Sequence, residues 1–231
     1  MYHKISTDSS DKLTVTLETF QKQMDYLKRE NYTSLKFSDL YDIINGKKQA
    51  PAKPLIITFD DGYENNFELA APVLKKNNFT YTIFVVADNI GKLNTWDKTA
   101  ERLMSIEQLK ILQQSNAETG LHSFAHKNFN DMSIEEFQKD TADSIRILND
   151  AGLNFCPAIA YPYGAFPEDS RKNEFKKILT ENGIIFGLKI KSKINKIPPA
   201  DNYELTRINV KGTDSFLDFK IKMKKGKVKL F

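Results

Sequence analysis

The chain has 231 residues, of which 40% are apolar and 11% aromatic, and its formal net charge is +4. This bulk predicts one globular domain with a full-sized core and leaves no room for a second domain. The single cysteine, Cys156, excludes an internal disulfide, and no run of about 18 apolar residues is present to span a membrane. The body shows no basic face with interleaved aromatic residues, so we expect no nucleic-acid partner.

Strand-like and helix-like segments alternate along the chain, as a β/α barrel requires. The expected strands are residues 1–5, 54–57, 80–87, 157–161, 184–188 and 205–210. The expected helices are residues 18–31, 40–44, 63–78 with an interruption near Pro72, 105–115, 133–151 and 170–182. The capping boxes Ser105-x-x-Gln108 and Ser133-x-x-Glu136 predict where two of these helices begin.

Two adjacent aspartates, Asp60 and Asp61, lie in the segment of residues 58–63 that directly follows the apolar run of residues 54–57. The carboxyl ends of strands are where α/β folds place their chemistry, because the loops there vary while the strands hold them rigid. Two neighbouring carboxylates are costly to bury without a cation or a shared proton. The segment therefore predicts a metal site, although aspartates in this position could also cap a helix.

Two of the three histidines, His122 and His126, lie four residues apart at the end of another apolar segment. This spacing places two imidazoles on one side of a turn, which is a common way to give a metal two nitrogen ligands. Such a pair also arises by chance. With one aspartate the set has three ligands, and three ligands leave a position open for water or substrate, as catalytic sites do.

A third segment, Tyr161-Pro-Tyr-Gly164, combines the end of an expected strand with a turn. In order and spacing, Thr-Phe-Asp60-Asp61-Gly-Tyr, His122-Ser-x-x-His126 and this segment resemble the first three motifs of the polysaccharide deacetylase family. The family is also called the NodB homology domain or carbohydrate esterase family 4. The resemblance covers roughly residues 1–210. It implies a single-domain, distorted (β/α) barrel, which we place at residues 1–212, followed by a carboxyl-terminal helix and basic tail at 213–231.

The resemblance also implies roles for the motif residues. Asp61, His122 and His126 would hold one divalent metal, expected to be zinc, although cobalt, nickel or iron suits the same ligands. Asp60 would act as general base, and the amide of Tyr163 would stabilise the oxyanion. The implied reaction is hydrolysis of the N-acetyl amide of an amino sugar in a polysaccharide, an oligosaccharide or a lipid-linked glycan.

The sequence departs from the usual family pattern in two places. No histidine follows His126, where most members carry a general acid, but Tyr2-His3 resembles a branch with permuted motifs in which an amino-terminal Tyr-His supplies this group. The alternative is that His3 is an ordinary surface or core histidine. Ala160 replaces an arginine that holds the catalytic aspartate in many members. Arg207 could supply that charge from the last strand, or lie on the surface.

Three aromatic residues are candidates for contacting a sugar: Trp96, Tyr161 and Tyr163. Trp96 could stack on a sugar ring or simply fill the top of the barrel, and each tyrosine could serve packing instead. The alternative to a deacetylase is a catalytically weak or inactive saccharide-binding protein on the same fold. The missing carboxyl-terminal histidine supports that alternative.

Six lysines lie in residues 220–231, which contain no acidic residue, so the rest of the chain is close to neutral. This basic tail could contact an anionic membrane peripherally, or be solvated, or form an edge strand. The first residues do not resemble a signal peptide. We therefore expect a cytoplasmic protein, with a location at the inner membrane face as one variant, or a secreted protein if the native amino terminus has been trimmed. The sequence leaves the oligomeric state open.

Overall fold

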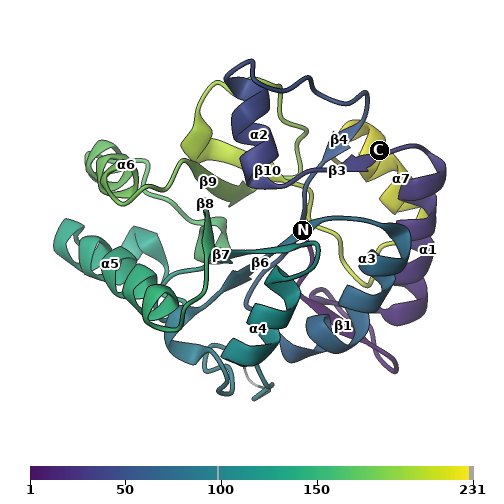
Figure 1. Cartoon of the computed structure of the whole chain (residues 1–231), viewed down its shortest axis with the longest axis horizontal. Coiled ribbons are helices and arrows are strands. Elements are labelled where there is room, and N and C mark those ends of the chain that lie inside the picture. The colour runs from purple at the N-terminus through teal and green to yellow at the C-terminus, as the bar shows by residue number, and fades with distance from the viewer. Residues whose placement is uncertain (98, 229–231) are drawn as a thin grey trace.

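A computed structural model describes residues 1–97 and 99–228 and is built around a curled sheet of six parallel strands (Figure 1). Along the sheet the strand order is β10-β9-β8-β7-β6-β5. The bounds are β5 Ile57–Phe59, β6 Tyr81–Val85, β7 Ala117–Leu121, β8 Phe155–Ala160, β9 Phe186–Ile190 and β10 Leu205–Arg207. Because neighbouring strands follow one another in sequence, this is the half-barrel of a single-domain (β/α) fold, as predicted.

Helices cover the outer side of the sheet, with α5 and α6 packed together on one flank and α1 against α3 and α7 on the other (Figure 1). Their bounds are α1 Leu17–Arg29, α2 Phe37–Ile44, α3 Ala71–Asn77, α4 Ile106–Gln113, α5 Ile134–Asp150, α6 Arg171–Glu181 and α7 Phe216–Lys225. The predicted capping boxes are present, since the hydroxyls of Ser105 and Ser133 accept from the backbone of Gln108 and Glu136. Local capping chemistry therefore fixes where α4 and α5 begin.

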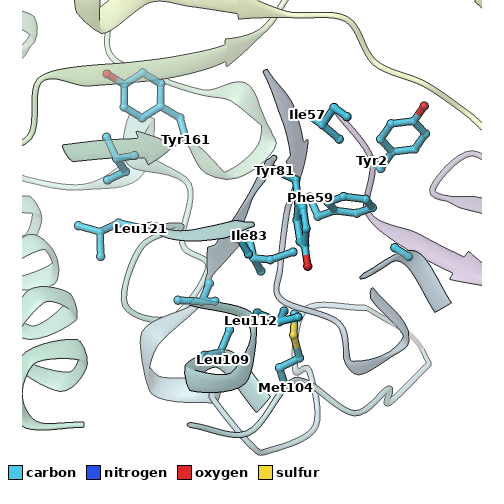
Figure 2. Close-up of a cluster of buried hydrophobic side chains, with 14 of the residues drawn as sticks. Tyr2, Ile57, Phe59, Tyr81, Ile83, Met104, Leu109, Leu112, Leu121 and Tyr161 are labelled. Carbon is cyan, nitrogen blue, oxygen red and sulfur yellow. The ribbon is translucent and has the colours of Figure 1, made fainter. Parts of the chain in front are cut away.

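The amino-terminal segment extends the sheet beyond β5. Tyr2 forms a parallel bridge with Phe59. The Tyr2 N–H donates to the Thr58 carbonyl at 2.8 Å, and the Asp60 N–H donates to the Tyr2 carbonyl at 3.0 Å. Figure 2 shows the Tyr2 ring beside that of Phe59, and their centroids lie 5.5 Å apart. His3 is thereby fixed next to the aspartates that end β5.

The same segment also reaches the opposite edge of the sheet. The Met1 amine donates to the Ile208 carbonyl at 2.9 Å, and the Val210 N–H donates to the Met1 carbonyl at 3.1 Å. Met1 and Tyr2 therefore link β5 to residues 208–210, which follow β10. We call this link the seam, and it joins the two edges of the curled sheet. Beyond the seam, β1 (Lys4–Ser6) pairs with β2 (Thr14–Thr16) in a separate parallel ribbon.

Two expectations for the middle of the chain need correction. The expected strand at residues 54–57 is divided, because β4 (Pro54–Leu55) pairs with β3 (Thr33–Ser34) while β5 starts at Ile57 and pairs with β6. The expected interruption near Pro72 is a π-helical segment, Asn66–Ala70, that runs directly into α3. Pro72 lies in the first turn of α3, where a missing N–H costs no intrahelical hydrogen bond.

Helix α7 covers Phe216–Lys225, so the edge-strand alternative is wrong for this described part of the tail. α7 packs on α1, where the buried ring of Phe219 meets Tyr26. Lys222 pairs with Asp214 and donates to a backbone carbonyl, so this lysine serves packing. Within the described residues, no helix is both long and apolar enough to cross a membrane. Membrane contact by the basic tail, the cellular location and the domain boundary at 212 stay predictions; Lys229 lies outside the described residues.

Candidate metal and catalytic site

A sharp turn after β5 buries both aspartates. Asp61 and Gly62 both adopt left-handed backbone conformations, with φ of 73° and 80°. A side chain at position 62 would crowd Val85, because an added Cβ would lie 3.3 Å from Cγ1 of that residue. Asp60 and Asp61 are 1% and 4% exposed. Since a buried carboxylate needs a compensating charge or hydrogen bond, each aspartate must have a partner in the site.

The two histidines lie on a tight loop that follows β7. The His122 N–H continues the strand pairing by donating to the Val85 carbonyl at 2.9 Å. Ser123 and His126 adopt φ of 65° and 57°, and these left-handed residues fold the loop back on itself. Both imidazoles are buried, and both face Asp61: each Nε2 lies 3.2 Å from the same oxygen, Asp61 Oδ1. The predicted set of Asp61, His122 and His126 is therefore assembled.

The partner of Nδ1 in each ring bears on whether Nε2 faces Asp61 with a lone pair. His122 Nδ1 lies 2.7 Å from the Ala160 carbonyl, which can only accept, so the hydrogen of a neutral ring is on Nδ1. His126 Nδ1 lies 3.1 Å from the hydroxyl of Tyr163, which can donate or accept, so this contact orients the ring without fixing its tautomer. Outer partners of this kind orient metal-binding histidines, and a carbonyl partner also fixes the tautomer.

This donor set fits a divalent cation. Three potential ligand atoms, one each from Asp61, His122 and His126, lie within 4.8 Å of one another, and Asp61 Oδ1 is buried without a hydrogen-bond partner. Lone pairs on one oxygen and two nitrogens repel each other when they converge, unless a proton or a metal ion lies between them. Two imidazoles with a carboxylate form a set that zinc and other first-row metals accept.

The charges in the site favour a cation as well. Burial alone would lower the pKa of His122, but the Asp61 and Asp60 carboxylates outweigh it and raise the pKa. Burial alone would raise the pKa of Asp61, but the nearby imidazoles of His122 and His126 hold it well below its ordinary value. The site therefore attracts positive charge to its centre, whether a proton or a metal ion.

Asp60 is paired with the arginine that the sequence suggested. Nη1 and Nη2 of Arg207 lie 2.5 and 2.8 Å from the two carboxylate oxygens of Asp60. Arg207 is 6% exposed, so the alternative of a surface arginine is wrong. Burial opposes ionisation of Asp60, but the charge of Arg207 overcomes it and lowers the pKa. Asp60 is therefore ionised at neutral pH and held in a fixed orientation.

His3 lies within the electrostatic reach of this group. Burial lowers its pKa, whereas the charges of Asp61 and Asp60 act in the opposite direction. Its carbonyl accepts from the side-chain amide of Asn66 at 2.8 Å, at the start of the π-helical segment. Its Nδ1 is buried and has no hydrogen-bond partner in the described part of the chain. The structure therefore brings His3 to the aspartate side of the site.

Two of the three aromatic candidates lie at His126. The Trp96 ring stacks on the imidazole, with centroids 4.5 Å apart and planes 19° from parallel, so one face of the indole is already covered. Tyr163 is 60% exposed and its hydroxyl meets His126 Nδ1. This side-chain contact was not predicted, because the sequence pointed to the Tyr163 amide. Direct contact of a sugar with Tyr163 stays a prediction.

Tyr161 is not placed to contact a substrate. Its side chain is 0% exposed, and its hydroxyl donates to the Tyr203 carbonyl at 3.0 Å. The ring stacks on Phe166 at 4.4 Å between centroids, within the core. The expectation of a substrate contact is therefore corrected, because the side chain at this strand end turns into the core and away from the metal ligands.

The sequence analysis missed Asp140, whose buried carboxylate accepts from the backbone of the histidine loop. A signal was present, because Phe137, Thr141, Ser144 and Leu148 mark the buried face of the 133–151 helix, and Asp140 lies on the same face. An ionisable residue within a core-facing stripe indicates a specific partner.

An open groove of about 630 Å³ lies beside His126. It is lined by His126, Lys127, Asn128, Asp131, Met132, Glu136 and Tyr163. Of the Asp-His-His set only His126 lines this groove.

A parallel half-barrel with a buried Asp-His-His set at its strand ends defines the class: an α/β barrel protein with a side-chain set that could hold a metal ion. Comparison with protein families makes the assignment specific. The family model described as polysaccharide deacetylase matches residues 47–179, and the chain belongs to this family.

Related proteins agree with this assignment. The poly-beta-1,6-N-acetyl-D-glucosamine N-deacetylase of Staphylococcus epidermidis is 31% identical over 218 residues, which are 88% of this chain and 70% of that protein. YxkH of Bacillus subtilis is 30% identical over 172 residues, 74% of this chain, but the match spans only 58% of YxkH. IcaB from Ammonifex degensii has the same fold, with a TM-score of 0.81 and 24% identity over 98% of this chain and 95% of that one.

Proposed function

We propose that the protein is a metal-dependent deacetylase that hydrolyses the N-acetyl amide of an amino sugar in a saccharide chain and releases acetate. The observation that carries the proposal is the convergence of two groups of residues. One is the Asp61, His122 and His126 set, and the other is the Asp60–Arg207 pair with His3. The N-deacetylase activity for which the staphylococcal relative is named supports the same chemistry.

The bound ion would be held by Asp61 and by Nε2 of His122 and His126. We propose zinc, with cobalt, nickel and iron as alternatives that the same ligands accept. A divalent metal with an open position supplies Lewis acidity, which makes water acidic enough to attack an amide at neutral pH. The Nδ1 hydrogen bonds to Ala160 and Tyr163 keep both rings turned toward the ion.

Asp60 accepts the proton that the attacking water loses. Its low pKa keeps it ionised, and the fork of Arg207 fixes the direction of both oxygens. A base that cannot rotate needs no reorientation as the reaction begins. The oxyanion formed at the acetyl carbonyl is the group that the Tyr163 amide would stabilise.

His3 donates a proton to the amide nitrogen so that the sugar can leave as an amine. Because burial lowers the pKa of His3, a proton held there is easily given up. The protons balance. Asp60 takes one proton from the water, and His3 gives one proton to the amide nitrogen. The proton on Asp60 then returns to His3 through solvent. Acetate and the free amino sugar are the products.

The substrate we propose is an N-acetylated glucosamine polymer or oligomer. The groove beside His126 is open to solvent, and the exposed ring of Tyr163 offers a face for a sugar ring. An extended saccharide could therefore pass the site without threading an end into it.

The first test measures metal per chain in the wild type and in His126→Ala after stripping and refilling with zinc. We expect one tightly held ion in the wild type, and loss of tight binding in the variant. Acetate release from β-1,6-linked N-acetylglucosamine oligomers is then compared between zinc-loaded and metal-free protein. A folded wild type that binds no metal and releases no acetate would contradict the proposal and favour the saccharide-binding alternative.

A further inference from the structure

Asp140 is a buried carboxylate that the proposed reaction does not use. It projects from the middle of α5 and is 7% exposed. Within residues 1–97 and 99–228, no basic side chain comes within ion-pair distance of it. Burying a carboxylate without a counter-charge is costly, so such a residue needs a compensating contact.

That contact is the backbone of the histidine loop. Both carboxylate oxygens of Asp140 accept from the N–H of Phe124, at 3.0 and 3.1 Å. Phe124 lies at the centre of the loop, two residues after His122 and two before His126. A charged acceptor makes a stronger hydrogen bond to an amide than a neutral one does, and here it acts in a dry environment.

The loop needs such support, because its backbone is strained. Ser123 and His126 both have positive φ, and a left-handed conformation costs a non-glycine residue about 1–2 kcal/mol. On the opposite side, the N–H groups of Ala87 and Asp88 donate to the carbonyls of Ser123 and Phe124, at 3.1 and 2.9 Å. The loop is therefore clamped between backbone donors on one side and the Asp140 carboxylate on the other.

The helix that carries Asp140 is itself firmly held. Ser133 and Glu136 form the capping box at its start. The Phe137 ring, one turn before Asp140, stacks on Phe175 of α6 with centroids 3.9 Å apart. A carboxylate on a packed helix is a rigid support, and support of this kind keeps the ligands of a metal site at a fixed separation.

We propose that Asp140 is a positioning residue for the metal site: its carboxylate holds the Phe124 amide and thereby sets the separation of His122 and His126. This inference rests on the metal site of the proposed function. Asp140 touches neither the ion nor the substrate, and it acts through the loop. Loss of its contact weakens metal binding by about tenfold or more, which is the usual effect of removing an outer partner of a metal ligand.

The test uses Asp140→Asn and Asp140→Ala in the full chain. Asp143→Asn is the matched control, since Asp143 lies on the same helix and pairs with Lys139 and Arg146 at the surface. Zinc affinity is measured by competition with a chelating dye, and folding is checked by thermal unfolding of the metal-free proteins. The visible absorption of the cobalt-loaded proteins reports the ligand geometry, which a merely structural role elsewhere would not change.

We expect the Kd for zinc to rise about tenfold in Asp140→Asn, with a changed cobalt spectrum, and to stay the same in Asp143→Asn. If Asp140→Ala does not fold, the result for Asp140→Asn decides, because the asparagine side chain has the same shape as the aspartate that it replaces. A folded Asp140→Asn with wild-type zinc affinity and cobalt spectrum overturns the inference. A wild type that binds neither metal overturns the proposed function instead, so the two failures are distinguishable.

Discussion

In the proposed mechanism His3 and Asp60 divide two proton transfers between them, and at the scale of single residues this division can be tested directly. We expect His3→Ala to lower the rate of acetate release by about 10²–10⁴-fold, the usual contribution of a general acid. Metal content should be unchanged, because His3 lies outside the Asp-His-His set. Acetate assays and metal analysis on the same samples check this. Wild-type turnover in the variant would remove His3 from the mechanism.

Asp140 makes a second prediction at this scale. Burial raises its pKa from an ordinary 3.8 to about 6, although the Phe124 N–H opposes the shift. Between these values the folded state holds a proton that the unfolded state has lost, so folding stability falls as pH rises. The stabilisation is fully present below about pH 4 and is lost as pH passes 6.

The prediction is measured on metal-free wild type and Asp140→Asn by urea unfolding at several pH values. The wild-type free energy of unfolding, relative to the variant, should fall by about 2 kcal/mol between about pH 4.5 and 7.5. Other carboxylates titrate equally in both proteins and cancel in the difference. A difference that does not change with pH would mean that the folded Asp140 has an ordinary pKa.

The sequence predicted the residues whose partners are close along the chain or share a motif. Asp60 and Asp61 were found because charge at a strand end needs compensation, and the histidine pair because of its spacing. The Arg207 partner was found by asking where a missing charge could come from. Tyr161 was misplaced because residue order at a strand end does not say which way the side chain turns. Asp140 was missed because only packing brings α5 to the loop.

At the scale of elements, the packing of β9 against the segment after β8 depends on a glycine. A Cβ added to Gly187 would lie 1.7 Å from the Tyr161 hydroxyl oxygen. We expect Gly187→Ala to displace Tyr161 from its hydrogen bond with Tyr203 and to destabilise the fold by about 2–3 kcal/mol, as overpacking does. Urea unfolding measures the change.

Gly183→Ala is the control for this prediction. Gly183 precedes β9 and has φ of 74°, and nothing lies within 4 Å of an added Cβ. Its substitution should cost only about 1 kcal/mol, from the left-handed backbone. Equal losses in the two variants would show that backbone conformation, and not the contact with Tyr161, decides the effect at Gly187.

Elements with strong local signals were predicted, and elements defined by distant contacts were not. The boxes at Ser105 and Ser133 gave the starts of α4 and α5. β2, β3 and β4 are only two or three residues long, so alternation of side chains cannot reveal them. They exist because each pairs with a neighbour. The expected strand at 54–57 was divided for the same reason, since two different partners compete for one apolar run.

At the scale of the whole molecule, a bound metal adds to folding stability because it binds the folded ligand set. At zinc concentrations of about 100 Kd we expect about 2.7 kcal/mol of added stability. For a chain of this size that corresponds to a rise in Tm of about 5–10 °C. Thermal scans with and without zinc check this, with His126→Ala as the control that should show no rise. A wild-type Tm that is independent of zinc would contradict tight binding.

The seam at Met1 joins an amino-terminal segment to residues that are synthesised much later. The three candidate metal ligands lie within residues 61–126, whereas Asp60 receives its arginine from position 207 and His3 is fixed beside β5 by an amino-terminal segment that also bonds to Ile208. Contacts across such long separations form late, because their loop-closure entropy is paid before they give any stabilisation. The Asp-His-His set can therefore assemble before Arg207 reaches Asp60. On the proposed mechanism, activity would appear only after Met1 has bonded to the residues that follow β10.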